Sequence, residues 1–247
     1  MGKVEDYRKQ LRALPRWDDF LLQESGLPGP RGNLELAVAV AEEAASGRLE
    51  AYLSFGPAEA PEGTRQEFLA FCGVLGLGDE LPGGGKAALR RLRSWASDPR
   101  WRIREAVAMA LQRFGDKDMG ALLADLDSWI GGNCLERRAV VAAVAEPRLL
   151  REPEHVQRAL ALVDRVTHSL LREADRRHPD FRVLRQGLGY AWSVIVAAGP
   201  RSGKRAMERW LRSGDPDIRW VMWENLNKAR LERMDRSWTL GWRTKVV

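Results

Sequence analysis

Apolar residues recur along most of the chain with the spacing of amphipathic helices, and no run shows the alternation expected of a strand. Helices are predicted over about residues 4–14, 17–24 and 34–46. Asn33 is the expected N-cap of the third of these helices. Thr64 and Glu67 have the spacing of a capping box, which predicts another helix from that point. The pattern as a whole predicts an all-α protein.

Four short segments of the chain can be aligned with one another, and they begin at Ile103, Glu136, Leu184 and Ile218. Each has Arg at its second position and a large apolar residue seven positions further on. The arginines are 33, 48 and 34 residues apart, and a weaker fifth copy begins at Thr64. Repetition at this period is typical of helical solenoids, in which each unit buries its apolar face against its neighbours. The sequence therefore predicts a right-handed α-solenoid that forms a single domain.

The predicted domain has three parts. Residues 1–60 supply N-terminal helices that cap the array, residues 61–234 supply the repeats, and residues 235–247 form a C-terminal tail without helical periodicity. The tail carries Trp238 and Trp242. Two interpretations stay open for it, docking through these rings or a mobile chain end.

An Asp-Pro turn separates the two helices of the clearest repeat unit. Asp98 is the predicted N-cap of the second helix and Pro99 its first residue. Asp215 and Pro216 repeat this turn near the C-terminus. The turn, followed by an isoleucine-arginine pair and an apolar helix, resembles the HEAT repeat, which implies stacked helical hairpins.

The charge of the chain is unevenly distributed. The net charge is +6 at pH 7, and from Pro200 onward twelve Lys/Arg face six Asp/Glu. The chain also has ten tryptophans. Arginine and tryptophan together are typical of surfaces that hold phosphates and stack on bases, and they are equally typical of protein-interface hot spots. A basic excess of this size favours anionic partners.

Other features of the sequence exclude several classes of protein. No apolar run reaches the roughly 18–20 residues needed to cross a bilayer, and the first residues lack the apolar core of a secretory signal. Cys72 and Cys134 fall within helical patterns and are expected to be reduced core residues. His155, His168 and His178 lie too far apart for a metal site. We expect a cytoplasmic monomer without a metal or cofactor.

One local pair of residues is suited to catalysis. Trp101 and Glu105 are four residues apart and so share a helix face. An aromatic wall beside a carboxylate is suited to stabilising a cationic sugar intermediate, as in the cleavage of an N-glycosidic bond. Tyr190 would extend this aromatic surface. The alternative is structural, with Trp101 packing between repeats and Glu105 interacting with the helix dipole.

The repeated arginines are candidates for binding phosphate, because solenoids display their second helices along one face. The candidate phosphate ligands are Arg104, Arg137, Arg138, Arg185 and Arg219, and the candidate groove aromatics are Trp192, Trp220 and Trp223. The alternative is an internal ladder of ion pairs, for which Asp98 and Asp215 are available. That alternative is favoured for Arg104 and Arg219, whereas Arg137 and Arg138 have no Asp-Pro turn before them and are equally suited to an exposed role.

Two longer segments and the Trp101–Glu105 pair resemble one known family. LDSWIGGNCLERRAVV, from Leu126, and LRQGLGYAWSV, from Leu184, look like segments of the HEAT-like-repeat DNA alkylation-repair glycosylases of the AlkD type. The resemblance implies an all-helical solenoid that grips duplex DNA with a concave basic face and excises alkylated bases. The chain is also similar to bacterial HEAT-repeat proteins for which no activity follows.

The resemblance also implies roles for particular residues. The family uses an Asp, an Arg and two Trp for base excision. In this chain the Asp position holds Glu105, the Arg is Arg137 or Arg138, the second Trp is replaced by Tyr190, and a further downstream Arg is replaced by Ser193.

Two functions from different classes follow from the sequence. The first is a DNA-binding HEAT-like protein, either a glycosylase for alkylated bases or a damage-recognition relative with degenerate catalytic residues. The second is a protein-interaction scaffold without enzymatic activity, in which the same Trp and Arg residues bind a protein or peptide. The sequence favours duplex DNA as the partner and leaves catalysis undecided.

Overall fold

A computed structural model describes residues 2–246, and within that range every regular element is a helix. The chain divides into two compact units, an N-terminal unit (Met1–Lys117) and a C-terminal unit (Asp118–Val247). The predicted all-α class is confirmed. The boundary between the units lies inside residues 61–234, which the sequence pattern predicts to be one repeat array.

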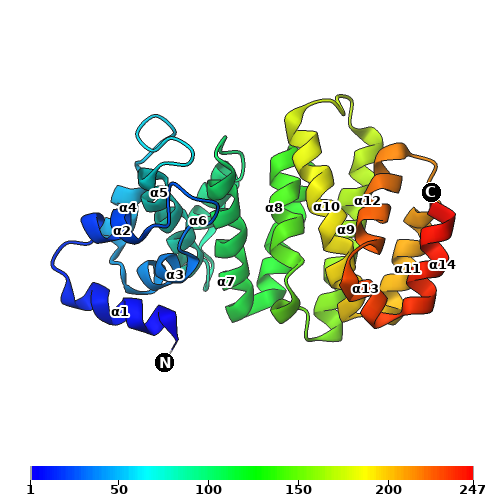
Figure 1. Ribbon diagram of the computed structural model, residues 1–247, viewed down its shortest axis with the longest axis horizontal. Coiled ribbons are helices and arrows are strands. Elements are labelled where there is room, and N and C mark those ends of the chain that lie inside the picture. The colour runs from blue at the N-terminus through cyan, green and yellow to red at the C-terminus, as the bar shows by residue number, and fades with distance from the viewer. Residues whose placement is uncertain (1, 247) are drawn as a thin grey trace. The chain divides into compact units, whose positions relative to one another are not determined.

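The N-terminal unit contains α1 (Lys3–Ala13), α2 (Asp18–Glu24), α3 (Leu34–Glu43), α4 (Ser46–Leu53), α5 (Arg65–Gly76), the 3-10 turn η1 (Leu77–Glu80), α6 (Lys86–Trp95) and the first part of α7 (Trp101–Asp125) (Figure 1). Its centre is α5, which packs against α2, α3 and α4. Residues 67–76 of α5 are all buried. Gly73 lets α4 approach closely, because a Cβ at this position would lie 2.9 Å from the backbone nitrogen of Leu53.

The C-terminal unit contains the rest of α7, η2 (Leu126–Gly131), α8 (Cys134–Val144), η3 (Pro147–Leu149), α9 (Pro153–Ser169), η4 (Leu170–Arg172), α10 (Pro179–Ala198), α11 (Pro200–Leu211), α12 (Pro216–Leu226), α13 (Ala229–Met234) and α14 (Arg236–Val246). Helix α10 packs between α8 and α12, so these three predicted second helices form one layer (Figure 1). Asn225 of α12 ties this layer together: its Nδ2 donates to Leu188 O at 2.8 Å, and its Oδ1 accepts from Ser193 N at 2.8 Å.

Helix α7 is interrupted at the boundary between the units. Asp118 has φ −152° and ψ 89°, which no α-helix contains. Its Oδ1 accepts a hydrogen bond from Ala121 N at 2.8 Å. Asp118 therefore caps the start of the following helical segment, and the short polar side chain explains why the helix restarts here.

The predicted helix starts are confirmed in part. Asn33 Oδ1 accepts from Leu36 N at 3.1 Å, and Asp215 Oδ1 accepts from the backbone nitrogens of Asp217 and Ile218. The capping box at Thr64 is wrong, because the Thr64 side chain makes no cap hydrogen bond. Glu67 Oε2 accepts instead from Gly63 N at 2.8 Å, so the carboxylate turns into the unit rather than closing the box.

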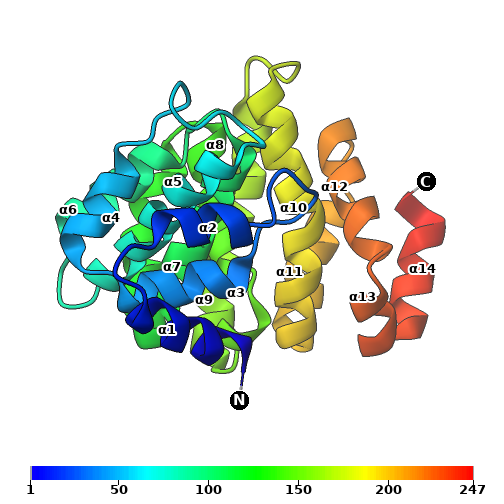
Figure 2. The same cartoon turned by 60° about the vertical axis from the view of Figure 1, so that its left-hand side comes forward.

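The C-terminal tail forms a helix, which the sequence pattern does not predict. Residues 236–246 form α14, which packs against α12 and α13 (Figure 2). Asp235 caps this helix by accepting from Trp238 N at 3.0 Å, and the Trp238 indole nitrogen donates to Glu208 Oε1 at 2.7 Å. Of the two interpretations left open, docking is the one that the structure has. The periodicity was missed because α14 presents few large apolar residues to its neighbours.

Both cysteines are free and buried. Burial raises the pKa of the Cys72 thiol far above its ordinary value, and it raises the pKa of Cys134 to about 11. Thiols held in this state are inert core groups. No helix within residues 2–246 is long and apolar enough to cross a membrane.

Candidate functional site

The predicted site residues fall into two sets, one in each unit. Trp101 and Glu105 begin α7 in the N-terminal unit, whereas Tyr190, Arg137 and Trp220 belong to the C-terminal unit. The two units also differ in charge. The N-terminal unit has 17 Lys/Arg and 17 Asp/Glu, whereas the C-terminal unit has 23 Lys/Arg and 17 Asp/Glu, so the C-terminal unit carries the whole net charge.

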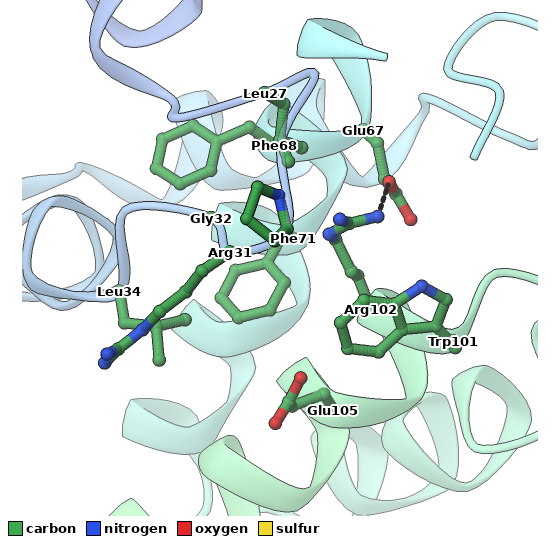
Figure 3. A pocket seen from close by; sticks show the side chains of 11 residues that line it. Leu27, Arg31, Gly32, Leu34, Glu67, Phe68, Phe71, Trp101, Arg102 and Glu105 are labelled. Atoms are coloured by element: carbon green, nitrogen blue, oxygen red, sulfur yellow. Dashed lines mark hydrogen bonds and ion pairs between the residues drawn. The ribbon is translucent and has the colours of Figure 1, made fainter. Parts of the chain in front are cut away.

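The N-terminal unit contains a cavity of about 450 Å³ between α5, the start of α7 and the loop over residues 25–33 (Figure 3). Its aromatic walls are Phe68, Phe71 and Trp101. The loop that closes it depends on Gly26, which has φ +74° and whose Cβ would lie 2.8 Å from Arg31 O. We call this space the α5–α7 cavity.

A buried ion pair lies along the wall of this cavity. Glu67 is 0% exposed, and its Oε2 contacts Arg102 Nη1 at 3.4 Å. Glu67 Oε1 and Arg102 Nε are buried without a hydrogen-bond partner. Burial raises the pKa of Glu67, against the hydrogen bond from Gly63 and the charge of Arg102. Each side chain of the pair therefore keeps one buried polar atom without a hydrogen bond, which lowers the stability of the fold in a low-dielectric site.

Arg102 is held by two further contacts. Its Nη2 donates to Gly29 O at 2.7 Å, and its guanidinium carbon lies 4.5 Å from the ring centroid of Trp101. The side chain thereby connects the loop, the carboxylate and the aromatic wall. It also determines which face of Trp101 remains available, since one face of the ring carries the guanidinium.

The structure places Trp101 and Glu105 on this one cavity, which the helical spacing predicts. Trp101 is 41% exposed. The Glu105 side chain is half-buried and has no hydrogen-bond or ion-pair partner among residues 2–246. A catalytic role for either residue stays a prediction. The neighbouring Glu67 was expected only in a capping box and not at this site; the signal that points to it is an acidic residue within a run of buried helical positions.

The repeated arginines do not form one uniform row of phosphate ligands. Arg137 is buried, and its Nη2 donates to Glu173 Oε2 at 2.6 Å while Nη1 donates to Ser169 Oγ at 2.7 Å. Of the two roles left open for Arg137, the structure shows the internal one, because the turn after α9 supplies the carboxylate of Glu173. Arg185 is bound in the same way by Asp217, at 2.6 Å.

Arg104 and Arg219 contact backbone carbonyls rather than the expected aspartates. Arg104 Nη1 donates to Asp98 O and Pro99 O at 2.7 and 2.8 Å. Arg219 is exposed, and its Nη2 donates to Val246 O at 3.1 Å. The carboxylate of Asp98 is bound instead by the buried Arg100, at 2.8 Å. The predicted aspartate ladder is thus wrong for these two arginines, while Arg138 lies half-buried on α8.

The residues of the predicted aromatic groove lie in different environments. Trp192 is 0% exposed, and its indole nitrogen donates to Thr167 Oγ1 at 2.9 Å, so it is a core residue and not a groove residue. Trp220 is half-buried beneath Arg185, whose guanidinium carbon lies 4.4 Å from its ring centroid. Tyr190 is exposed and is covered in the same way by Arg230, at 4.4 Å.

A basic pocket lies at the end of the C-terminal unit, between the turn before α12 and the end of α14. Its volume is about 490 Å³, its charged lining residues are Arg212, Arg219 and Lys245, and no Asp or Glu of residues 2–246 lines it. The Arg212 guanidinium carbon and the Lys245 Nζ each lie 5.2 Å from the ring centroid of Trp242. We call this the Trp242 pocket. Arg219 is shared with an adjacent pocket of about 370 Å³ that Trp220 and Trp223 line.

Within residues 2–246, no group of three or more His, Cys, Asp or Glu is placed to hold a metal ion. No protein-family model, curated protein or solved structure matches the chain.

Proposed function

We propose that the protein binds DNA and that the C-terminal unit contacts the phosphate backbone through the Trp242 pocket. The observation that carries this proposal is the lining of the pocket: Arg212 and Lys245 lie over the Trp242 ring, Arg219 lines the same space, and no acidic side chain among residues 2–246 lines it. Three cations without a carboxylate repel one another, and an anion in the pocket relieves that repulsion.

The aromatic rings of this unit support the recognition of phosphate over the stacking of bases. Trp242, Trp220 and Tyr190 each carry a cation of the same chain against the ring. A base would have to displace that cation before it could stack. Arg185 also binds Asp217 and Arg230 also donates to the Tyr190 hydroxyl, whereas Arg212 has no ion pair among residues 2–246 and can offer N–H groups to phosphate oxygens. The rings therefore hold the cations in place, which lowers the entropy cost of binding.

Phosphate contacts carry no base information, so the proposal predicts binding to duplex DNA without strong sequence preference. The proposed function is DNA binding and does not include base excision. Two of the groups that the family resemblance assigns to base excision have partners within the chain, because Arg137 binds Glu173 and Tyr190 holds Arg230. Base excision by Glu105 would need a separate demonstration.

The test compares two triple variants that remove the same charge from the same unit. The first, Arg212→Gln with Arg219→Gln and Lys245→Gln, empties the Trp242 pocket of cations. The matched control, Arg182→Gln with Arg205→Gln and Arg233→Gln, changes three exposed arginines outside the pocket. Fluorescence anisotropy with a short labelled duplex is measured at several salt concentrations.

We expect the pocket variant to bind at least tenfold more weakly than the wild type. The slope of log K against log salt should fall by about 2.7, since each phosphate contact contributes about 0.9. The control should stay within about threefold of the wild type. Equal losses in the two variants would contradict the pocket assignment. If the wild type fails to bind duplex at low salt, the proposal is wrong and the protein-interaction scaffold takes its place.

A further inference from the structure

The α5–α7 cavity of the N-terminal unit has the size and walls of a small-molecule site. Its volume of about 450 Å³ lies within the range of ligand pockets, which are typically apolar with a few placed polar groups. Phe68, Phe71 and Trp101 supply flat apolar surfaces on two different helices. A planar ligand of one or two rings matches this space.

The charges around the cavity determine the sign of the ligand. Arg102 is paired with Glu67 and with Gly29 O, so its charge is compensated. Arg31 extends its guanidinium away from Glu67 and Arg102 (Figure 3). Glu105 has no hydrogen-bond or ion-pair partner among residues 2–246, and it lies beside Trp101 and Phe71 (Figure 3). A carboxylate next to aromatic faces attracts a cation and repels an anion.

A second, independent observation points the same way. Glu67 Oε1 is buried in the wall of the same cavity and accepts no hydrogen bond. A buried acceptor of this kind lowers stability until a donor reaches it. Two carboxylates with unused acceptor oxygens on one cavity favour a ligand with several N–H donors over a ligand with one.

We propose that the α5–α7 cavity binds a small planar organic cation whose charge is carried on N–H groups, such as an arylamidine or an aminopyridinium. Its charged end lies at Glu105, its apolar body lies against Trp101 and Phe71, and a remaining N–H is directed to the wall that holds Glu67. This site goes beyond DNA binding, and it involves none of the residues of the Trp242 pocket.

The experiment is isothermal titration of the full-length protein with three probes of one shape: benzamidine, benzamide and benzoate. We expect benzamidine to bind at least tenfold more tightly than neutral benzamide, and benzoate to show no binding. Glu105→Gln should weaken benzamidine binding at least tenfold, whereas Glu105→Asp, which keeps the charge, should stay within about threefold. The matched control is Glu59→Gln, which changes an exposed carboxylate of the same unit outside the cavity.

Equal affinity for benzamide and benzamidine would overturn the proposal, and so would wild-type affinity in Glu105→Gln. Thermal unfolding of each variant separates a lost site from a lost fold. If Glu105→Gln does not fold, the comparison of the three probes on the wild type still decides the matter. DNA binding measured on the same samples should not change in Glu105→Gln, so failure here is distinguishable from failure of the Trp242 pocket.

Discussion

Arginines stack on indole rings in both units, but their surroundings differ. In the N-terminal unit, Arg102 stacks on Trp101 and is buried against the carboxylate of Glu67. In the C-terminal unit, Arg212 lies over the Trp242 ring in an open pocket that no Asp or Glu of residues 2–246 lines. The same pair of side chains is therefore structural where a carboxylate and burial accompany it, and available to a ligand where they do not. An arginine–tryptophan pair in a sequence does not distinguish the two cases.

The largest effect should come from breaking the buried pair. Arg102→Met leaves Glu67 as a buried carboxylate without its partner, and we expect the free energy of unfolding to fall by about 3 kcal/mol. Arg212→Met removes an exposed cation and should change it by no more than about 0.5 kcal/mol. Urea denaturation of both variants measures the difference. If the two losses are equal, burial does not separate the two arginines.

A second comparison concerns two arginines at the same repeat position. Arg137→Gln removes a buried charged hydrogen bond to Glu173, so stability should fall by about 1.5–3 kcal/mol. The salt slope of DNA binding should be unchanged. Arg219→Gln should change the free energy of unfolding by no more than about 0.5 kcal/mol. It should reduce the salt slope of DNA binding by about 0.9. A salt slope that falls for Arg137→Gln would show that this arginine contacts phosphate.

The contributions of Glu67 and Asp215 to stability should depend on pH with opposite signs. The raised pKa of Glu67 means that the folded state takes up the proton first, so this group's contribution to stability rises as pH falls from 7 toward the unfolded value of about 4.3. Burial alone would raise the pKa of Asp215, but hydrogen bonds from Arg176 and backbone amides outweigh it and lower the pKa. The contribution of Asp215 is therefore present above its unfolded value of about 3.9 and is lost as pH falls through the folded one.

The measurement is the difference in unfolding free energy between the wild type and each of Glu67→Gln and Asp215→Asn from pH 7 to pH 3. As pH falls, the unfolding free energy of the wild type should rise relative to that of Glu67→Gln. It should fall relative to that of Asp215→Asn. Slopes of the same sign for both residues would contradict the assigned environments.

The smallest effect concerns the ring of the Trp242 pocket. Trp242→Leu keeps all three cations but removes the ring that holds Arg212 and Lys245, a contact worth about 0.5–1 kcal/mol. DNA binding should weaken by about two- to fivefold with an unchanged salt slope. A loss beyond tenfold would indicate that the ring contacts the nucleic acid directly.

The helical class and many helix starts could be predicted from the sequence, because both depend on local interactions. Apolar spacing, Asn33 and Asp215 act within one or two turns of chain. The pairing of Trp101 with Glu105 on one face follows from helical geometry in the same way. These are properties of neighbouring residues, and the fold does not need to be known to infer them.

Only the tertiary structure decided which charged and aromatic residues are free. Arg137 and Arg219 have the same place in the repeat pattern, yet one meets Glu173 and the other meets Val246 O, from segments 36 and 27 residues away. Trp192 is buried and donates to Thr167 of another helix, and Glu67 meets Arg102 only after α5 and α7 pack together. Burial and ion pairing depend on distant parts of the chain, so the sequence by itself determined the helices, and their packing determined the candidate sites.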